Sequence, residues 1–298
     1  MSAPAAHPPA DAPWTVGRIL EWTTQHLQKH GSDSPRLDAE LLLAKARGCP
    51  RIQLYVQFNE VVPDSQRTVM RDLVKRRTQA EPVAYLIGRR EFFGLEFRVT
   101  RDVLVPRPDT ETLVLELVTE ARKFERPRIL DVGTGSGCIA IAAAVSVPTA
   151  LVTAVDDSSA ALAVARENAA RHKTGDRVTF LEGDLFAPVP PGTMFDFVAS
   201  NPPYVADGEI EQLPPDIRQH EPLRALRGGP DGLDVIRRLL AGAPLVLKPG
   251  GKLLVEFSPE QADLILQLCG ESPGFREPKI LKDLEGRARV LVATRQPG

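Results

Sequence analysis

The most specific chemical signal in the sequence is Asn201, Pro202, Pro203 and Tyr204, which follow the apolar segment Phe195–Ala199. The prolines fix their φ angles and lack N–H groups, so carbonyl oxygens beside them can face outward as acceptors. The Asn201 side-chain oxygen and the Pro202 carbonyl can accept hydrogen bonds from one planar NH2 group, on whose flat face the Tyr204 ring can stack. Asn-Pro also occurs in plain turns. The four residues predict a cradle that aims an amide or an exocyclic base amine at an electrophile.

A glycine-rich loop lies upstream, in the segment ILDVGTGSGCIAIAAA, between an apolar strand and an apolar helix. Glycines let the backbone approach a ligand closely. Cys138 stands where a dinucleotide fingerprint needs its third small residue, and the Gly-Lys-Ser/Thr of a P-loop is absent. The spacing is similar to the D-x-G-x-G-x-G loop of S-adenosylmethionine-dependent methyltransferases, while a tight turn without a ligand is the alternative. The predicted cofactor-binding residues of the loop are Gly133, Thr134, Gly135, Ser136 and Gly137.

Acidic residues follow the next two predicted strands. Asp156 ends LVTAVD and can accept hydrogen bonds from both hydroxyls of a ribose. Asp157 points the other way on an extended chain and is expected at a helix entry. Asp184 follows VTFLEG and is the candidate partner for an adenine amino group, with Leu185 or Phe186 packing on the ring. A simple turn after the glycine that precedes Asp184 is the alternative.

The elements that position these residues alternate between apolar strands and helices from Arg128 onward. This alternation predicts a mostly parallel sheet covered on both faces. The short connection near the C-terminus favours an antiparallel final pair. The predicted strands are Arg128–Val132, Leu151–Val155, Val178–Leu181, Phe195–Ala199, Lys252–Phe257, Phe275–Lys282 and Arg287–Thr294, and the predicted helices include Ser159–Arg171 and Asp234–Ala241.

The domain plan predicted from the sequence has four parts. Residues 1–14 are proline-rich and predict a disordered tail. Residues 15–88 carry helical apolar stripes and predict a small bundle, in which Lys75–Arg77 is expected to be a solvated helix end. Residues 89–108 predict a β-hairpin linker, and residues 109–298 hold the motifs described above.

Composition narrows the class of protein. The 298 residues include 37 Lys and Arg against 39 Asp and Glu, a net charge of −2, which disfavours stable nucleic-acid binding. The three cysteines are far apart, so neither a disulfide framework nor a Cys/His metal site is expected, and reduced cytoplasm fits best. The longest strongly apolar run, Ile139–Val147, is too short to cross a bilayer.

Two further segments carry a resemblance to a known family. EFFGLEFRVTRDVLVPRPDTETLV and EPLRALRGGPDGLDVIRRLL, together with the glycine loop and NPPY, resemble the HemK/PrmC family of protein-(glutamine-N5) methyltransferases. The resemblance covers nearly the whole chain after the tail. It implies a Rossmann-like class I methyltransferase sheet, mostly parallel with an antiparallel last strand, and a small N-terminal helical bundle that recognises the substrate protein.

The resemblance also implies a reaction. S-adenosylmethionine is the implied methyl donor, and the glutamine of the Gly-Gly-Gln loop in class I peptide chain release factors is the implied acceptor. In the family pattern Gly133–Gly137, Asp156, Asp184, Leu185 and Asn201 contact the cofactor. Asn201, Pro202, Pro203 and Tyr204 hold the glutamine. Position 185 is often Trp in the family and is Leu here, which leaves Phe186 as a candidate to stack on adenine instead.

Some roles and two other functions stay open. Arg107 is placed either to pair with the cofactor carboxylate or to cap an acidic surface, and Asp109 is placed to cap the following helix. His220 and Glu221 are expected to be structural because direct methyl transfer needs no acid or base. The alternative functions are a nucleic-acid amino-methyltransferase, which would have to take a flipped base, and a non-enzymatic adapter that docks on a translation factor.

Overall fold

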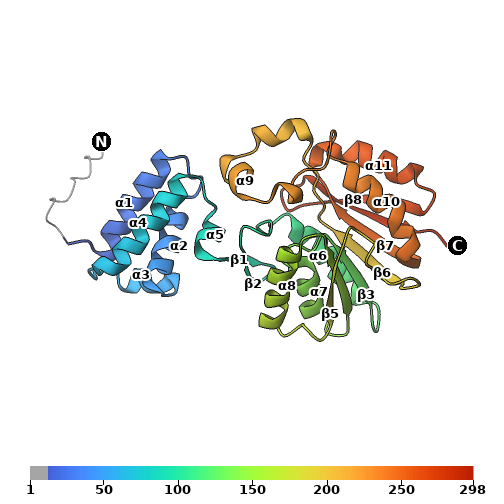
Figure 1. Ribbon diagram of the computed structural model, residues 1–298, viewed down its shortest axis with the longest axis horizontal. Coiled ribbons are helices and arrows are strands. Elements are labelled where there is room, and N and C mark those ends of the chain that lie inside the picture. Colours follow the sequence, from blue (N-terminus) through green and yellow to red (C-terminus); the bar gives the residue numbers. More distant parts are fainter. Residues whose placement is uncertain (1–12, 298) are drawn as a thin grey trace. The chain divides into compact units, whose positions relative to one another are not determined.

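The structure, a computed structural model, describes residues 13–297. The predicted tail therefore lies almost wholly outside the described residues. The chain forms two compact units, one ending at Ile87 and the other beginning at Gly88, and Figure 1 labels their elements.

The described residues of the first unit are helical. Thr15 caps the first helix by accepting a hydrogen bond from the Arg18 N–H, and Gly48 ends the second in the left-handed conformation. The apolar stripes meet in a core that includes Leu20, Leu42 and Leu54. The helices are α1 (Val16–Lys29), α2 (Pro35–Arg47), α3 (Arg51–Val56), α4 (Asp64–Thr78) and α5 (Val83–Ile87).

The basic run at the end of α4 differs from the sequence prediction of a solvated helix end. Arg76 binds the buried carboxylate of Glu81 through two nitrogens, at 2.9 and 2.7 Å. Arg77 donates to the buried Asp38 at 2.9 Å. The position of these residues at the end of a helix predicted only solvent exposure. Their ion pairs instead join α4 to the loop after it and to α2.

The second unit begins with a hairpin, β1 (Arg89–Phe92) paired antiparallel with β2 (Leu95–Arg98). Gly94 makes the turn at a φ of 71°. The side-chain amide of Asn168 accepts a hydrogen bond from the Arg98 N–H at 2.7 Å and donates to the Arg98 carbonyl at 3.0 Å. Residue 168 belongs to the helix Ser159–Arg171, which packs on the main sheet, so the hairpin is fastened to the sheet domain.

The main sheet has the strand order β5-β4-β3-β6-β7-β9-β8. The first five strands in this order are parallel, and β9 is antiparallel to both of its neighbours, which confirms the predicted mixed sheet. The chain leaves β3 towards β5 on one side and returns to β6 on the other, so β3 and β6 flank a topological switch point. The strands are β3 (Arg128–Val132), β4 (Leu151–Asp156), β5 (Val178–Glu182), β6 (Phe195–Ser200), β7 (Leu247–Glu256), β8 (Phe275–Lys282) and β9 (Ala288–Arg295).

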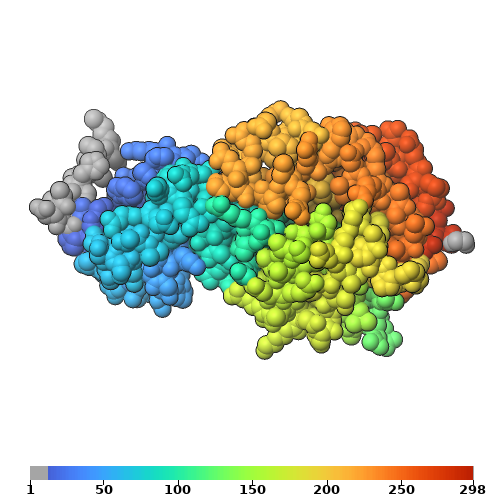
Figure 2. Space-filling model, viewed as in Figure 1, coloured from blue at the N-terminus to red at the C-terminus, as the bar shows by residue number. Residues whose placement is uncertain are grey.

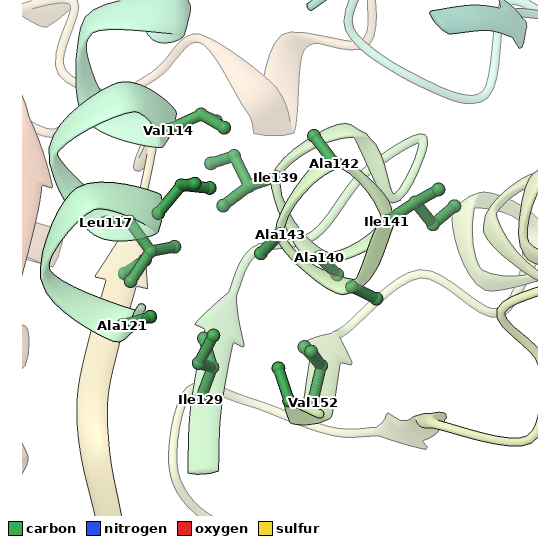
Figure 3. Close-up of a cluster of buried hydrophobic side chains, with 14 of the residues drawn as sticks. Val114, Leu117, Ala121, Ile129, Ile139, Ala140, Ile141, Ala142, Ala143 and Val152 are labelled. Carbon is green, nitrogen blue, oxygen red and sulfur yellow. The ribbon is translucent and has the colours of Figure 1, made fainter. Parts of the chain in front are cut away.

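Helices cover both faces of this sheet (Figure 1), and alternate strand residues serve the two cores. Ile129 of β3 faces the core under α6 and α7, while Leu130 faces the core under α10. In Figure 3, Val114 and Leu117 of α6 point towards Ile139 of α7. The helices are α6 (Thr110–Ala121), α7 (Cys138–Ser146), α8 (Ser159–Arg171), α9 (Pro215–His220), α10 (Asp234–Val246) and α11 (Ala262–Glu271), with 3-10 turns η1 (Asp207–Gln212), η2 (Leu223–Ala225) and η3 (Pro259–Gln261).

Candidate active site

The glycine loop joins β3 to α7 and has an unusual backbone. Gly133, Gly135 and Gly137 all have positive φ, at 73°, 55° and 81°. A Cβ at Gly133 or Gly135 would meet no atom within 4 Å, whereas one at Gly137 would lie 2.8 Å from Ile141. The first two glycines are therefore needed for their positive φ and lie beside open space. The third has a positive φ as well, and its missing side chain leaves room for Ile141 and Ala165.

Asp131 supports the loop from beneath. It is fully buried, and its Oδ2 accepts hydrogen bonds from the Thr134 hydroxyl at 2.6 Å and from the Ala140 N–H at 3.1 Å. Burial raises the pKa of this carboxyl to about 7, although both hydrogen bonds favour the ionised form. The contacts tie the loop to the first turn of α7.

Asp156 at the end of β4 lies beside the same loop. Its Oδ2 accepts a hydrogen bond from the Gly135 N–H at 2.8 Å, and its Oδ1 accepts one from the Ser158 N–H at 2.9 Å. Burial raises its pKa, and the two backbone donors oppose that shift. The helix-entry role predicted for Asp157 is wrong, because Ser158 caps α8 and Asp157 is exposed.

The segment after β5 places Leu185 rather than Phe186 at the cavity. Leu185 lines the cavity at a positive φ of 48°. Phe186 packs instead against α10, where a Cβ on Gly242 would lie 2.5 Å from its ring. The stacking role considered for Phe186 is therefore wrong in this arrangement. Asp184 lines the cavity and forms an exposed ion pair with Arg238.

The NPPY residues follow β6, beside the carboxyl end of β3. The Asn201 Nδ2 donates to the Thr110 hydroxyl oxygen at 3.0 Å. Its Oδ1 has no donor among the described residues, so that oxygen is free to accept. The Tyr204 hydroxyl lies 3.4 Å from Oε1 of Glu256, the last residue of β7. Burial raises the pKa of Tyr204, so this phenol stays neutral.

Arg107 forms an ion pair with a buried carboxylate, and its predicted role towards the cofactor stays a prediction. Its Nη2 donates to Oε1 of Glu221 at 2.7 Å, and the Glu221 side chain is 2% exposed. Burial raises the pKa of Glu221, and the nearby guanidinium opposes the shift. Glu221 is thus structural, as expected, and it holds Arg107 at the cavity wall. The predicted Asp109 capping bond is absent, because that carboxylate pairs with Arg289 at 3.0 Å.

Two cavities of the second unit share Asn201 and Arg107 as lining residues. The larger, of about 260 Å³, is lined by the glycine loop, Asp156, Leu185 and Pro203. The smaller, of about 150 Å³, is lined by Pro202, Tyr204 and apolar side chains such as Leu213 and Ile217. Residues 205–226, which contribute part of the smaller cavity, lie in the yellow-to-orange segment at the surface of the second unit in Figure 2. The two cavities therefore adjoin at the Asn201 side chain.

Sequence reasoning missed Thr110 and Glu256. Thr110 lies within the PRPDTE segment, to which the sequence assigns no definite role, and Glu256 lies inside the predicted strand Lys252–Phe257. Both are almost completely buried. The only signal in the sequence was a single acid within an apolar strand. Its burial and its contact with Tyr204 are seen only in the fold.

Two absences concern the described residues alone. Residues 13–297 contain no group of three or more His, Cys, Asp or Glu side chains that could hold a metal ion. Within the same range no helix is both long and apolar enough to cross a membrane.

Comparisons with known proteins agree with this geometry. The family described as PrmC N-terminal domain matches residues 18–88, and the family described as Methyltransferase small domain matches residues 107–214. A Pyrococcus furiosus methyltransferase structure aligns with a TM-score of 0.51 and 20% identity, over 75% of this chain and 99% of that one. A Thermus thermophilus 16S rRNA N2 methyltransferase structure aligns with a TM-score of 0.52 and 20% identity, over 70% of this chain and 50% of that one. The fold and the site together define a methyltransferase domain that carries an N-terminal helical domain.

Curated relatives narrow the class further. The release factor glutamine methyltransferase of Rhodopirellula baltica is 48% identical, over 94% of this chain and 96% of that protein. The protein of the same name from Geobacter sulfurreducens is 42% identical, over 93% and 96%. The chain belongs to the release factor glutamine methyltransferase family, as the resemblance seen in the sequence predicted.

Proposed function

We propose that this protein transfers a methyl group from S-adenosylmethionine to the side-chain amide nitrogen, N5, of the glutamine in the Gly-Gly-Gln loop of class I peptide chain release factors. The observation that carries the proposal is the meeting of two cavities at Asn201, whose Oδ1 is free to accept. An amide NH2 needs acceptors of this kind. The names of the close relatives supply the release factor and the glutamine.

The larger cavity suits S-adenosylmethionine. Gly133 and Gly135 leave open space where side chains would otherwise stand. Each oxygen of Asp156 accepts one backbone N–H, and each keeps lone-pair capacity for a ribose hydroxyl. Asp184 and Leu185 line the part of the cavity assigned to adenine. When bound, this cofactor supplies an electrophilic methyl group on a positively charged sulfur. The remaining residues assigned to it are Thr134, Ser136, Gly137 and Asn201.

The smaller cavity suits the glutamine side chain. Asn201 Oδ1 and the Pro202 carbonyl accept its two N–H bonds, and the ring of Tyr204 lies against the amide plane. Pro203 keeps the turn stiff. During transfer the carbon–sulfur bond breaks, the nitrogen–carbon bond forms, and the nitrogen loses one proton to solvent. The apolar walls Leu213 and Ile217 limit water around the reacting groups, where a charge is being quenched.

The helical unit supplies a second contact for the release factor. A groove on it is lined by exposed Trp22, by Met70 and Val74, and by basic side chains including Arg71 and Lys75. Two contacts on one partner raise the effective concentration of the loop at the active site. The acceptor is then a folded protein rather than a nucleic acid, and the proposed site of action is the cytoplasm.

A methyl-transfer assay on a purified class I release factor tests this function. The reaction is read by peptide mass spectrometry, beside a matched factor whose loop glutamine is replaced by alanine. We expect one added methyl on the Gly-Gly-Gln peptide of the first factor and none on the second. Cofactor binding without transfer to the factor, combined with transfer to an RNA or DNA substrate, would refute the proposal.

A further inference from the structure

One face of α10 forms part of the wall of the larger cavity. Val235 and Arg238 are three residues apart, so they lie on the same face of the helix, and both line the cavity. Gly242 follows four residues after Arg238, and a Cβ at this glycine would lie 2.5 Å from the ring of Phe186. The ring therefore packs closely on this face of α10 and fastens the segment that follows β5 to it.

The same segment binds α10 through an ion pair. Nη2 of Arg238 donates to Oδ2 of Asp184, and both residues line the cavity. The two side chains are 54% and 62% exposed, and ion pairs so open to solvent contribute little to protein stability. Oδ1 of Asp184 has no donor among residues 13–297, so this oxygen is free to accept. The position of the pair on the cavity wall points to a ligand rather than to folding.

The chemistry of this part of the wall suits a flat aromatic ring that carries an amino group. Leu185 and Val235 are apolar, and both pack against the same core of the sheet. The guanidinium of Arg238 is planar, and such a group stacks well on an aromatic face. Its charge is compensated by Asp184, which disfavours an anion as the ligand. Oδ1 of the same carboxylate can accept a hydrogen bond from an amino group at the edge of the ring.

Two other arginines at this cavity lie elsewhere on its wall. Arg224 pairs with Asp157 at 3.7 Å, and Arg227 pairs with Asp207 at 2.6 Å. Neither carboxylate belongs to the segment that follows β5. Arg238 is therefore the arginine that the structure holds beside Leu185.

We propose that Arg238 covers one face of the adenine of S-adenosylmethionine, and that Asp184 holds its guanidinium in this position. The inference rests on the proposed function, which assigns this part of the cavity to adenine. Asp184 divides two tasks between its oxygens, since Oδ2 binds Arg238 and Oδ1 accepts from the adenine amino group. Arg238 thus contacts the cofactor and takes no part in the methyl transfer itself.

The test compares Arg238→Ala and Arg238→Lys with Arg237→Ala as the matched control. Arg237 is the neighbouring residue on α10, pairs with Asp231 and Asp234, and is not among the described residues that line the larger cavity. Lysine keeps the positive charge but lacks the planar guanidinium. The measurement is the Kd for S-adenosylmethionine by calorimetry, on the full-length protein without a release factor. Circular dichroism shows that each variant is folded.

We expect Arg238→Ala to raise the Kd for S-adenosylmethionine by roughly 3- to 30-fold, the scale of one cation–π contact. Arg238→Lys should also raise the Kd, because an ammonium group cannot lie flat on a ring. Arg237→Ala should change the Kd by less than about 2-fold, as is usual for a surface substitution. A wild-type Kd in either Arg238 variant, or an equal rise in Arg237→Ala, would overturn the inference.

A double variant tests the part played by Asp184. Asp184→Ala removes the acceptor for the amino group and also releases Arg238. Adding Arg238→Ala to it should therefore raise the Kd by less than about 2-fold more. If the fold-changes of the two single variants instead multiply, Asp184 does not hold Arg238 over the ring and the inference fails.

The outcome for the proposed function is read separately, by methyl transfer to a release factor. Kd values that follow the expected pattern in a protein that methylates no release factor would count against the proposed acceptor alone. Unchanged Kd values in a protein that does methylate a release factor would overturn the role of Arg238 alone.

Discussion

Replacing Glu256 by glutamine should stabilise the protein, and by an amount that grows with pH. Burial raises the pKa of this carboxyl from 4.5 to about 7 in the folded chain. A group whose folded pKa is raised holds its proton more tightly when folded, so the free energy of unfolding falls as pH rises from about 4.5 to about 7. Glutamine carries no charge at any pH and removes this cost.

The magnitude follows from the shift. A change of about 2.5 pKa units, from 4.5 to about 7, corresponds to about 3 kcal/mol once both states are ionised. We therefore expect Glu256→Gln to gain about 3 kcal/mol relative to the wild type at pH 8, and less than about 1 kcal/mol at pH 5. Any hydrogen bond gained or lost by the carboxamide adds an offset that does not vary with pH. The pH dependence of the difference is the quantity to measure.

The assay is denaturant unfolding of both full-length proteins at pH 5, 6, 7 and 8, followed by circular dichroism. Tryptophan fluorescence is unsuitable because both tryptophans, Trp14 and Trp22, lie in the first unit. Asp131, whose pKa is also raised to about 7, is present in both proteins and cancels in the difference. A stability difference that is the same at pH 5 and pH 8 would show that folding does not raise the pKa of Glu256.

Three other predictions concern function. Asn201→Ala should lower kcat for the release factor by roughly 10²- to 10³-fold, the scale of removing one preorganised polar group; steady-state kinetics with unchanged turnover would contradict the cradle. Asp156→Ala should raise the Kd for S-adenosylmethionine at least about 10-fold by calorimetry, since it removes charge-assisted hydrogen bonds, whereas Asp157→Ala should change it less than about 2-fold; the reverse order would assign the ribose to Asp157. Trp22→Ala should raise KM for the intact release factor and leave KM for a short Gly-Gly-Gln peptide unchanged, and an equal effect on both substrates would argue against docking on the helical unit.

Much of the fold was accessible from the sequence because its signals are local. Strand β3 and helix α8 have the predicted bounds, and β4, β5 and β6 each extend one residue further. Apolar runs bounded by glycine or an acid mark buried parallel strands without reference to distant residues. Helix α10 continues to Val246 past Pro244, where the sequence prediction stopped at Ala241, because packing against the sheet overrides the local break.

The site was accessible only in part, and for a physical reason. The glycine loop, Asp156 and NPPY can be recognised in the sequence by residue type and order. Their roles in binding stay predictions. Thr110 and Glu256 cannot, because their contacts in the site, with Asn201 and Tyr204, join residues far apart in the chain. Single charged residues read as surface in a sequence, yet Glu81, Glu221 and Glu256 are all buried. The partners of such buried acids can be identified only in the folded structure.

The position of β9 in the sheet determines when the sheet can be completed during folding. Residues 288–295 form the last strand of the chain, and this strand lies between β7 and β8 rather than at an edge. Until those residues have emerged, β7 and β8 each expose an unpaired edge, which is a hazard for aggregation. The strand that ends at Glu256 therefore lacks one of its two neighbours until β9 has been added. Deletion of β9 should abolish folding of the second unit, because this strand is buried and lies between β7 and β8.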